Sequence, residues 1–274
     1  MTLPPHEEWS FDTTRIGRRV LVFDELDSTN TFAASLSPRI ATDPDGIVVV
    51  ARNQTAGRGR FGRAWRSRPG SSVLMSVVLT PPPELRRPVV LTAWAAVAVA
   101  EAIRAQVGVQ ARIKWPNDLL ISGKKVCGIL IEQGVGPEPT DDSRLLFRTV
   151  VGIGLNLSQT TDEFAAAGLP EATSLAVASR REIDLRTATG ALVTHLDAEY
   201  TRLLIGERVA VEADWKWRMG FLGRQVIVEQ TDGAKVSGRM REMGFDGIAL
   251  EGADGSVSVI VPEAIEHVRL AENG

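Results

Sequence analysis

The sequence predicts an α+β fold with a small β-barrel at its C-terminal end, and two observations carry that prediction. Before residue 220, buried apolar strands are interspersed with long helical segments. From Arg224 onward the pattern changes to short alternating strands, separated by Asp-Gly pairs at 232–233, 246–247 and 254–255. The expected organisation is therefore a leader at 1–27, a larger domain at 28–222 and a barrel at 223–274.

The elements of the larger domain each have a local signal. Capping residues at Asp27–Asn30 predict a helix start, continuous apolar runs predict buried strands, and Gly108 predicts the end of an alanine-rich helix. The predicted helices cover Thr31–Leu36, Val89–Val107, Thr187–Ile205 and Val209–Met219. The predicted strands cover Gly46–Arg52, Ser72–Leu79, Ala111–Trp115, Leu119–Ile121, Val126–Glu132 and Leu145–Leu157. The segment at 122–125, SGKK, joins two of these strands as a hairpin.

Composition excludes several classes of protein. Lys and Arg number 31 against 34 Asp and Glu, and a net charge of −3 gives no general attraction to nucleic acid. Hydrophobic residues at 44% and charged residues at 24% are ordinary for a globular chain and exclude wholesale disorder. Because Cys127 is the single cysteine, a disulfide framework and a multi-cysteine metal site are both excluded.

No targeting segment is visible at the start of the sequence, where a basic stretch followed by an apolar one would indicate a secretory signal. The longest apolar run, Val89–Ala100, has 12 residues and is too short to span a membrane. We therefore expect a cytoplasmic protein with no membrane partner.

An arginine-rich loop directly follows the strand at Gly46–Arg52. Its sequence at 54–65 is QTAGRGRFGRAW, and the segment from Arg52 to Arg68 holds six arginines and no acidic residue. Glycines let a backbone approach a ligand closely, and arginines supply forked donors for carboxylate and phosphate. The loop therefore predicts either an anion-binding site or a basic surface segment of the kind that contacts nucleic acid.

A turn at Asn117 and Asp118 is the second candidate. Pro116 keeps Trp115 extended and ends the strand, so that the two polar residues fall in a turn. Asn there can hold a sugar or phosphate and Asp can hold Mg²⁺. The alternative, an Asx turn that simply begins the hairpin, stays open at this point.

Three further groups are weaker signals on their own. Lys125 returns across the hairpin beside the small Gly128 and can meet a carboxylate or phosphate, whereas Lys124 is expected to be solvated. Gly152–Asn156, GIGLN, is a strand with small residues that a ligand or a loop can pass closely. Ser28–Asn30, STN, is either a helix cap or a binding group.

Taken together, these segments resemble the biotin protein ligases. The matching motifs are STN at 28–30, QTAGRGRFGRAW at 54–65, KWPNDLL at 114–120, GKKVCGILIE at 123–132 and GIGLN at 152–156, in the family's order. Five motifs in order are specific where each alone is not. Two departures, Phe61 in place of a basic residue and Cys127 in place of alanine, leave Arg58, Arg60 and Lys125 intact.

The resemblance implies a mixed β-sheet flanked by helices, the biotin–lipoate ligase fold, with an SH3-like barrel at about 224–270. It also implies a two-step reaction: biotin and ATP form biotinyl-5′-AMP, and a lysine of a biotin carboxyl carrier domain then takes the biotin. Some relatives carry an N-terminal DNA-binding domain. Only 27 residues precede STN here, so we expect a ligase-only protein that does not bind DNA, and we leave a homodimer open.

Physical roles follow from the resemblance. Buried ureido groups of biotin need hydrogen bonds, which Ser28–Asn30 and Gln54 can supply. Arg58, Arg60 and Lys125 would neutralise two approaching anions, and Trp65 would exclude water. We expect Arg60, Lys114 and Lys125 to be catalytic and Asp118 to hold Mg²⁺. The residues expected to bind biotin and ATP are Ser28, Thr29, Asn30, Gln54, Gly57, Arg58, Gly59, Arg60, Arg63, Trp65, Lys114, Asn117, Asp118, Lys125, Gly128, Gly152, Gly154 and Asn156.

Two other functions compete with this one. A lipoate or octanoate ligase of the same fold would need a longer apolar tunnel and fewer hydrogen-bond donors. A nucleic-acid-binding protein would use the arginine-rich loop and the barrel, but residues 224–274 carry five basic against nine acidic residues. None of the three histidines lies in a motif, and the base that deprotonates the acceptor lysine is not identified by the sequence.

Overall fold

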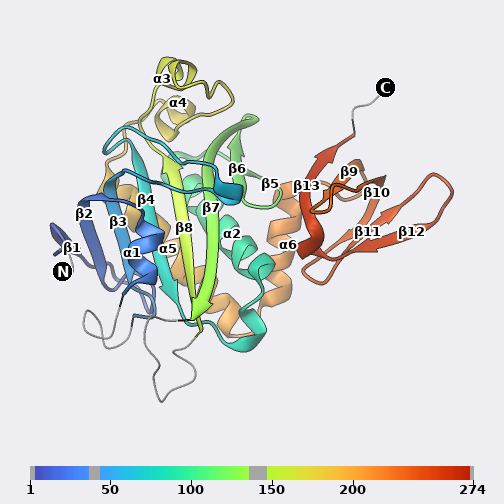
Figure 1. Cartoon of the computed structure of the whole chain (residues 1–274), viewed down its shortest axis with the longest axis horizontal. Coiled ribbons are helices and arrows are strands. Elements are labelled where there is room, and N and C mark those ends of the chain that lie inside the picture. Colours follow the sequence, from blue (N-terminus) through green and yellow to red (C-terminus); the bar gives the residue numbers. More distant parts are fainter. Residues whose placement is uncertain (1–3, 37–43, 136–146, 272–274) are drawn as a thin grey trace.

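An eight-stranded mixed sheet forms the larger part of the molecule (Figure 1). The structure is a computed structural model that describes residues 4–36, 44–135 and 147–271. Across the sheet the strands are β1 (Glu7–Trp9), β2 (Val20–Leu26), β3 (Val48–Gln54), β4 (Ser72–Leu79), β8 (Phe147–Asn156), β7 (Lys124–Val135), β6 (Asp118–Ile121) and β5 (Arg112–Lys114). Neighbours β2 and β3 are parallel and the other neighbours are antiparallel. The predicted α+β class and mixed sheet are confirmed.

Within the leader expected at 1–27, residues 7–9 and 20–26 form the first two strands of this sheet and are part of the larger domain. Strand β2 pairs with β3, so that Val20 lies opposite Val48. The physical reason is burial: Val20–Phe23 is a run of four fully buried apolar residues, because both faces of the sheet are covered there. Residues 145 and 146 of the predicted strand Leu145–Leu157 lie outside the described residues.

Helices cover the two faces of the sheet unequally. On one face lie α2 (Pro88–Val107), α5 (Leu185–Leu204) and α6 (Arg208–Met219), and Trp94 of α2 packs against Tyr200 of α5 with ring centroids 5.2 Å apart. On the other face, the short helix α1 (Thr29–Ala34) packs on Phe23 and its neighbours. Helix α2 is long and apolar enough to cross a membrane, but 67% of its most apolar window is buried inside the protein, as in a core helix.

Two short helices follow β8 and close the upper end of the sheet in Figure 1. Helix α3 (Thr161–Ala166) begins in a capping box, in which Thr160 and Glu163 exchange side-chain and backbone hydrogen bonds. Helix α4 (Leu175–Ser179) is capped by Ser174. Three 3₁₀ turns complete the described helical elements: η1 (Arg60–Gly62), η2 (Pro83–Leu85) and η4 (Pro262–Ala264).

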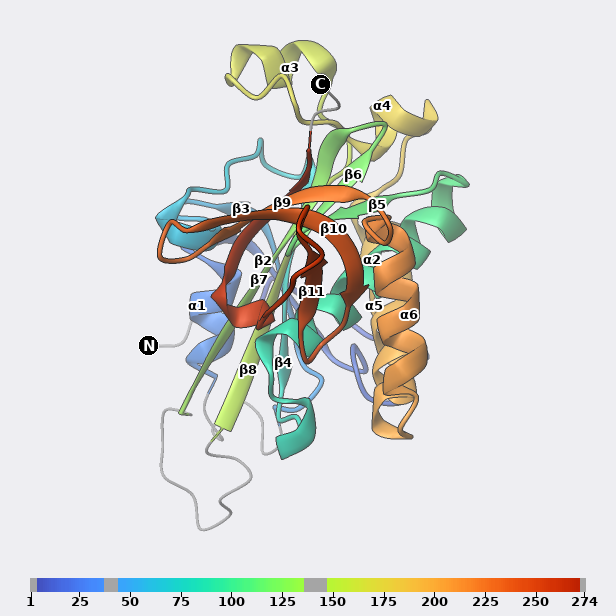
Figure 2. The same ribbon diagram turned by 90° about the vertical axis from the view of Figure 1, so that its right-hand side faces the viewer.

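The C-terminal strands form a second, separate antiparallel sheet (Figure 2). Its order is β12 (Val257–Ile260), β11 (Ile248–Glu251), β10 (Lys235–Met243), β9 (Gln225–Gln230) and β13 (Ile265–Leu270). The predicted barrel is wrong in one respect, because β12 and β13 are the two edges of this sheet and do not pair. Pro262, which has no N–H, lies just after β12 and begins the turn that carries the chain to the opposite edge. The boundary at residues 222–223 stays a prediction.

Aromatic side chains fix the second sheet against the first. Trp215 of α6 packs between Trp115 and Phe245, with ring centroids 5.5 Å from each. The indole Nε1 of Trp115 also donates to the carbonyl oxygen of Ile265 at 3.4 Å. Trp115 itself begins the turn at 115–117, and Asp118 is the first residue of β6, so the second sheet is packed directly against the turn that leads to Asp118.

Candidate active site

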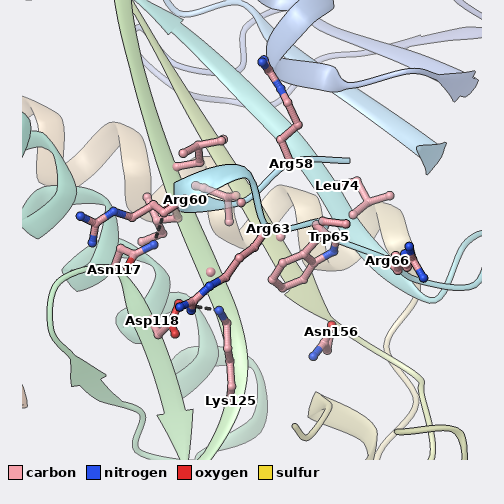
Figure 3. Close-up of a pocket in the computed structure, with 18 of the residues that line it drawn as sticks. Arg58, Arg60, Arg63, Trp65, Arg66, Leu74, Asn117, Asp118, Lys125 and Asn156 are labelled. Carbon is pink, nitrogen blue, oxygen red and sulfur yellow. Dashed lines mark hydrogen bonds and ion pairs between the residues drawn. The ribbon is translucent and has the colours of Figure 1, made fainter. Parts of the chain in front are cut away.

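A cavity of about 310 Å³ lies on the α1 face of the large sheet, under the arginine-rich loop (Figure 3). Every site residue predicted from the sequence lines it except Gly57. A Cβ atom at Gly57 would lie 2.5 Å from the carbonyl oxygen of Trp65, so glycine is required there for the two ends of the loop to approach. The backbone N–H of Trp65 donates to the Gly57 carbonyl at 2.9 Å, which closes the base of the loop.

One end of the cavity is a neutral hydrogen-bond network built on the start of α1. The amide oxygen of Gln54 accepts from Thr29 at both its backbone N (2.7 Å) and its Oγ1 (3.1 Å). Ser76 of β4 donates to Asn30 Oδ1 at 2.6 Å, and both Thr29 and Asn30 are only 4% exposed. A Cβ atom at Gly152 would lie 2.3 Å from Asn30 Oδ1, so this glycine makes room for the asparagine. STN is therefore both the cap of α1 and a buried polar wall.

Arg58 belongs to this end of the cavity. Its Nη2 lies 3.0 Å from Glu132 Oε2, the same oxygen that accepts from Asn30 Nδ2 at 2.7 Å. Figure 3 shows the Arg58 guanidinium pointing away from Lys125. The expected partnership of Arg58 with Arg60 and Lys125 is therefore not formed in this arrangement.

Lys125 and Asp118 form an ion pair at the opposite end, with Nζ 2.6 Å from Oδ1 (Figure 3). Strands β6 and β7 are in register at Asp118 opposite Gly128, and an irregularity after Leu119 brings Lys125 opposite Leu120. Lys124 is exposed, as predicted. Cys127 lies in the core, where burial raises the pKa of its thiol, and it does not line the cavity.

The indole of Trp65 packs directly on two paired glycines. Gly128 of β7 and Gly154 of β8 are cross-strand partners, and Cβ atoms there would lie 3.0 Å and 2.6 Å from Trp65 ring atoms. The sequence left open whether a ligand or a loop passes close to the strand that contains Gly154. In the structure the loop residue Trp65 does so. The ring lies 5.7 Å from Lys125 Nζ, and its buried Nε1 has no hydrogen-bond partner among the described residues.

The two asparagines expected on the nucleotide side use their amides to hold the wall of the cavity. Asn117 Nδ2 donates to the Ile129 carbonyl at 2.7 Å, and Asn156 Nδ2 donates to the Thr173 carbonyl at 3.0 Å. The first bond crosses to β7, so Asn117 ties the turn to the sheet. The second fixes the segment after α3, and a direct contact of either amide N–H with a ligand stays a prediction.

The tip of the loop is strained and basic. Phe61 has φ 56° in the left-handed region that favours glycine, is 58% exposed, and lies under the Arg60 guanidinium at 4.7 Å. Burial lowers the pKa of Arg60, while the negative charges of Asp118 and Glu266 oppose that change. Arg60 is therefore partly buried at the cavity, whereas Arg58 and Arg63 of the same loop are exposed.

The cavity is strongly positive. Six of its described lining residues are cationic, and Asp118 is the one acidic residue among them. The cationic residues are Arg58, Arg60, Arg63, Arg66, Lys114 and Lys125. Within the described ranges, no group of three or more His, Cys, Asp or Glu side chains can hold a metal ion. Such a cavity suits a ligand with several negative charges.

Sequence reasoning missed several lining residues. Phe164, Leu169 and Ala172 form an apolar wall beside Lys125, whose backbone N–H donates to the Glu171 carbonyl at 2.7 Å. The pattern Thr-x-x-Glu at 160–163 is a capping-box signal that indicates α3. His267, on β13 of the second sheet, also lines the cavity, and no local signal predicts this because it depends on how the two sheets pack.

Comparison with known proteins gives consistent matches. The sequence matches the biotin/lipoate A/B protein ligase family over residues 22–156. The biotin–[acetyl-CoA-carboxylase] ligase of Mycobacterium tuberculosis is 30% identical over 280 residues, which cover 97% of each chain. The bifunctional ligase/repressor BirA of Bacillus subtilis is 41% identical over 172 residues, or 63% of this chain, and the match spans 50% of the BirA length.

Solved structures show the same fold. The biotin protein ligase of Aquifex aeolicus in complex with biotin and ATP aligns with a TM-score of 0.74 at 23% identity, covering 92% of this chain and 99% of that one. The biotin acetyl coenzyme A carboxylase synthetase of Helicobacter pylori with bound biotinylated ATP aligns with a TM-score of 0.57 at 20% identity, covering 88% and 99%. At these identities the likeness is one of fold.

Proposed function

This chain belongs to the biotin protein ligase family, and from that premise we propose that it activates biotin with ATP and transfers it to a carrier-domain lysine. The first step forms biotinyl-5′-AMP and pyrophosphate, and the second releases AMP. The observation that carries the proposal is the division of one cavity into two ends. The polar end is neutral overall because Arg58 pairs with Glu132, whereas among the described lining residues the other end has several cations against the single carboxylate of Asp118. Biotin has the same division, because a neutral ureido ring and a carboxylate lie at its opposite ends.

The neutral end is matched to the ureido group. The oxygen of Gln54 is taken by Thr29, while its amide nitrogen has no partner among the described residues and is free to donate. Ser28 is 3% exposed, and its hydroxyl accepts only a long bond of 3.5 Å from Thr31. A buried ureido group would satisfy these side chains, whereas an aliphatic lipoyl or octanoyl tail would leave them unpaired.

The cationic end supports the adenylation step. The biotin carboxylate must approach the α-phosphorus of ATP, and the new O–P bond forms as the bond to pyrophosphate breaks. Lys125, Lys114 and Arg60 would offset the repulsion between these anions and the charge that develops in the transition state. The Lys125–Asp118 pair holds the ammonium in place before substrates arrive.

The nucleotide itself has two further supports. The apolar wall of Phe164, Leu169 and Ala172 offers a surface for a base, and it is held next to Lys125 by backbone hydrogen bonds. Trp65 would cover the intermediate and exclude water from the mixed anhydride. Its unpaired indole N–H indicates that a ligand acceptor completes the site.

Magnesium fits this site as a companion of ATP. Mg²⁺ commonly binds one or two carboxylates together with substrate phosphates and water, and Asp118 is the single described carboxylate in the cavity. When bound, the ion would shield phosphate charge and favour departure of pyrophosphate. Asp118 would hold it only together with the nucleotide, since Lys125 occupies one of its oxygens.

The partner in the second step is a biotin carboxyl carrier domain, and cytoplasmic localisation is part of the same proposal. The test is biotin-dependent release of pyrophosphate from ATP, measured with biotin, lipoate and octanoate in parallel. Biotin alone should support release, and magnesium should be required. Release with octanoate or lipoate but not biotin would reject the proposal in favour of a lipoate-type ligase, and release with none would reject both.

A further inference from the structure

The second sheet places one proton acceptor at the cavity. We propose that His267 is the general base that takes a proton from the acceptor lysine, which rests on the transfer activity proposed above. An incoming lysine is protonated at neutral pH, and its nitrogen cannot attack the biotinyl carbonyl until that proton is removed. A residue that removes it must line the cavity, be able to accept a proton, and be reachable from solvent.

Elimination among the described lining residues leaves His267. The lining arginines and lysines offer hydrogen-bond donors and no acceptor atom. Asp118 is the other acceptor, but its Oδ1 lies 2.6 Å from Lys125 Nζ, and its second oxygen is the one proposed above to hold Mg²⁺. Histidine is the side chain that ordinarily exchanges a proton near neutral pH.

The geometry of β13 suits this role. The His267 side chain lines the cavity and is 39% exposed, so that a lysine entering from solvent can reach it. The Glu266 carboxylate lies 3.6 Å from His267 Nε2, close enough to stabilise the imidazolium that forms when the ring takes a proton. Trp115 and Ile265, joined by a hydrogen bond, hold this strand against the active-site turn.

The charges around His267 come from several elements. Glu229 of β9 is its cross-strand partner, and Glu266 also acts electrostatically on Arg60. The charged residues on the elements packed around the imidazole are Arg60, Arg63, Lys114, Asp118, Glu229, Lys235, Glu266 and Arg269. The carboxylates stabilise an imidazolium once it forms, and the cations favour passing its proton on to solvent.

The step balances as follows. The acceptor ammonium gives one proton to the unprotonated ring nitrogen of His267, and the freed nitrogen lone pair attacks the acyl carbon of biotinyl-5′-AMP. The C–N bond forms, the C–O bond to phosphate breaks, and AMP leaves with that electron pair. The second proton on the new amide nitrogen goes to the departing phosphate, and His267 returns its proton to water. The products are the amide and AMP.

The experiment separates the two half-reactions of the full-length enzyme. His267→Gln is compared with His6→Gln, which makes the same change at an exposed histidine paired with Asp24. Single-turnover transfer from preformed biotinyl-5′-AMP to a carrier domain should slow by about 10²-fold or more in His267→Gln. Pyrophosphate exchange reports adenylation separately, so failure of the unsubstituted enzyme there disproves the proposed function, whereas loss of exchange in His267→Gln alone contradicts a role confined to transfer.

A small nucleophile distinguishes proton removal from every other effect. Hydroxylamine is unprotonated at neutral pH, and it should react with enzyme-bound adenylate at similar rates in the parent and in His267→Gln. Free imidazole should restore lysine transfer to His267→Ala, because the histidine position is open to solvent. The inference is overturned if transfer is unchanged in His267→Gln, if hydroxylamine is slowed as much as lysine, or if imidazole restores nothing. An unchanged transfer rate would show that a group other than His267 takes the proton.

Discussion

Lys124 and Lys125 are adjacent in the sequence but differ in what they contact. Lys125 pairs with Asp118 inside the cavity, and Lys124 is exposed. We predict that Lys125→Ala weakens biotin binding and adenylation by about 10- to 100-fold, because a charged hydrogen bond contributes about 1.5–3 kcal/mol. Lys124→Ala should change neither. Isothermal titration with biotin checks both variants, and equal losses would reject the assignment of Lys125.

The glycine pair under Trp65 gives a second prediction at the scale of single atoms. In Gly154→Ala the new methyl group would lie 2.6 Å from Trp65 Cε2, so the indole must move and adenylation should fall. Gly134→Ala, in β7, meets nothing within 4 Å and is the control. In a Trp65→Leu background, Gly154→Ala should add little further loss, because the clash has been removed. Additive losses would show that Gly154 acts independently of Trp65.

At the scale of elements, we expect the loop at 57–63 to change conformation when a ligand binds. Its glycines make ordering costly and its arginines repel one another without an anion nearby. We predict that the loop is more protease-sensitive without ligand. We also predict that Arg60→Gly speeds dissociation of biotinyl-5′-AMP, and that the released adenylate then reacts with bystander lysines. A loop equally protected with and without ligand, together with an unchanged dissociation rate, would contradict the lid interpretation.

The same scale shows what the sequence could predict. Strands and helices with long apolar runs, such as Ser72–Leu79 and Val89–Val107, were predicted within a residue of their observed bounds because length and period agree. Strand β2 was missed because Val20–Phe23 has four core residues between charged segments, which is too short for its pattern to be distinct. The open second sheet was not predictable, because strand patterns do not specify which edges pair.

The motif residues of the candidate site were predictable from the sequence, but the contacts between distant segments were not. Asp118 at the start of β6 and Lys125 near the start of β7 meet in one cavity because the two strands pair in the sheet. The support of Trp65 by Gly128 and Gly154 and the presence of His267 were not predictable, because they arise from packing between distant segments. The roles of these residues in binding and catalysis stay predictions.

At the scale of the whole molecule, the two sheets work as one unit through Trp115, Trp215 and Phe245. Phe245 is fully buried, so Phe245→Ala should lower the free energy of unfolding by about 3–5 kcal/mol. It should also slow transfer while leaving biotin affinity within about a factor of two, because STN lies at the other end of the cavity. Val259→Ala, 70% exposed on the same sheet, should change neither stability nor transfer. A parallel loss of biotin affinity would contradict this division.

Covalent transfer to one lysine is the central claim, and mass spectrometry of the acceptor tests it most directly. A purified biotin carboxyl carrier domain is incubated with the enzyme, biotin, ATP and magnesium, beside an acceptor whose target lysine is replaced by arginine. The account predicts that one biotinyl group appears on the target lysine, that it depends on ATP, and that the substituted acceptor gains none. No mass increase on the intact acceptor, or an octanoyl or lipoyl group accepted in preference to biotin, would contradict it.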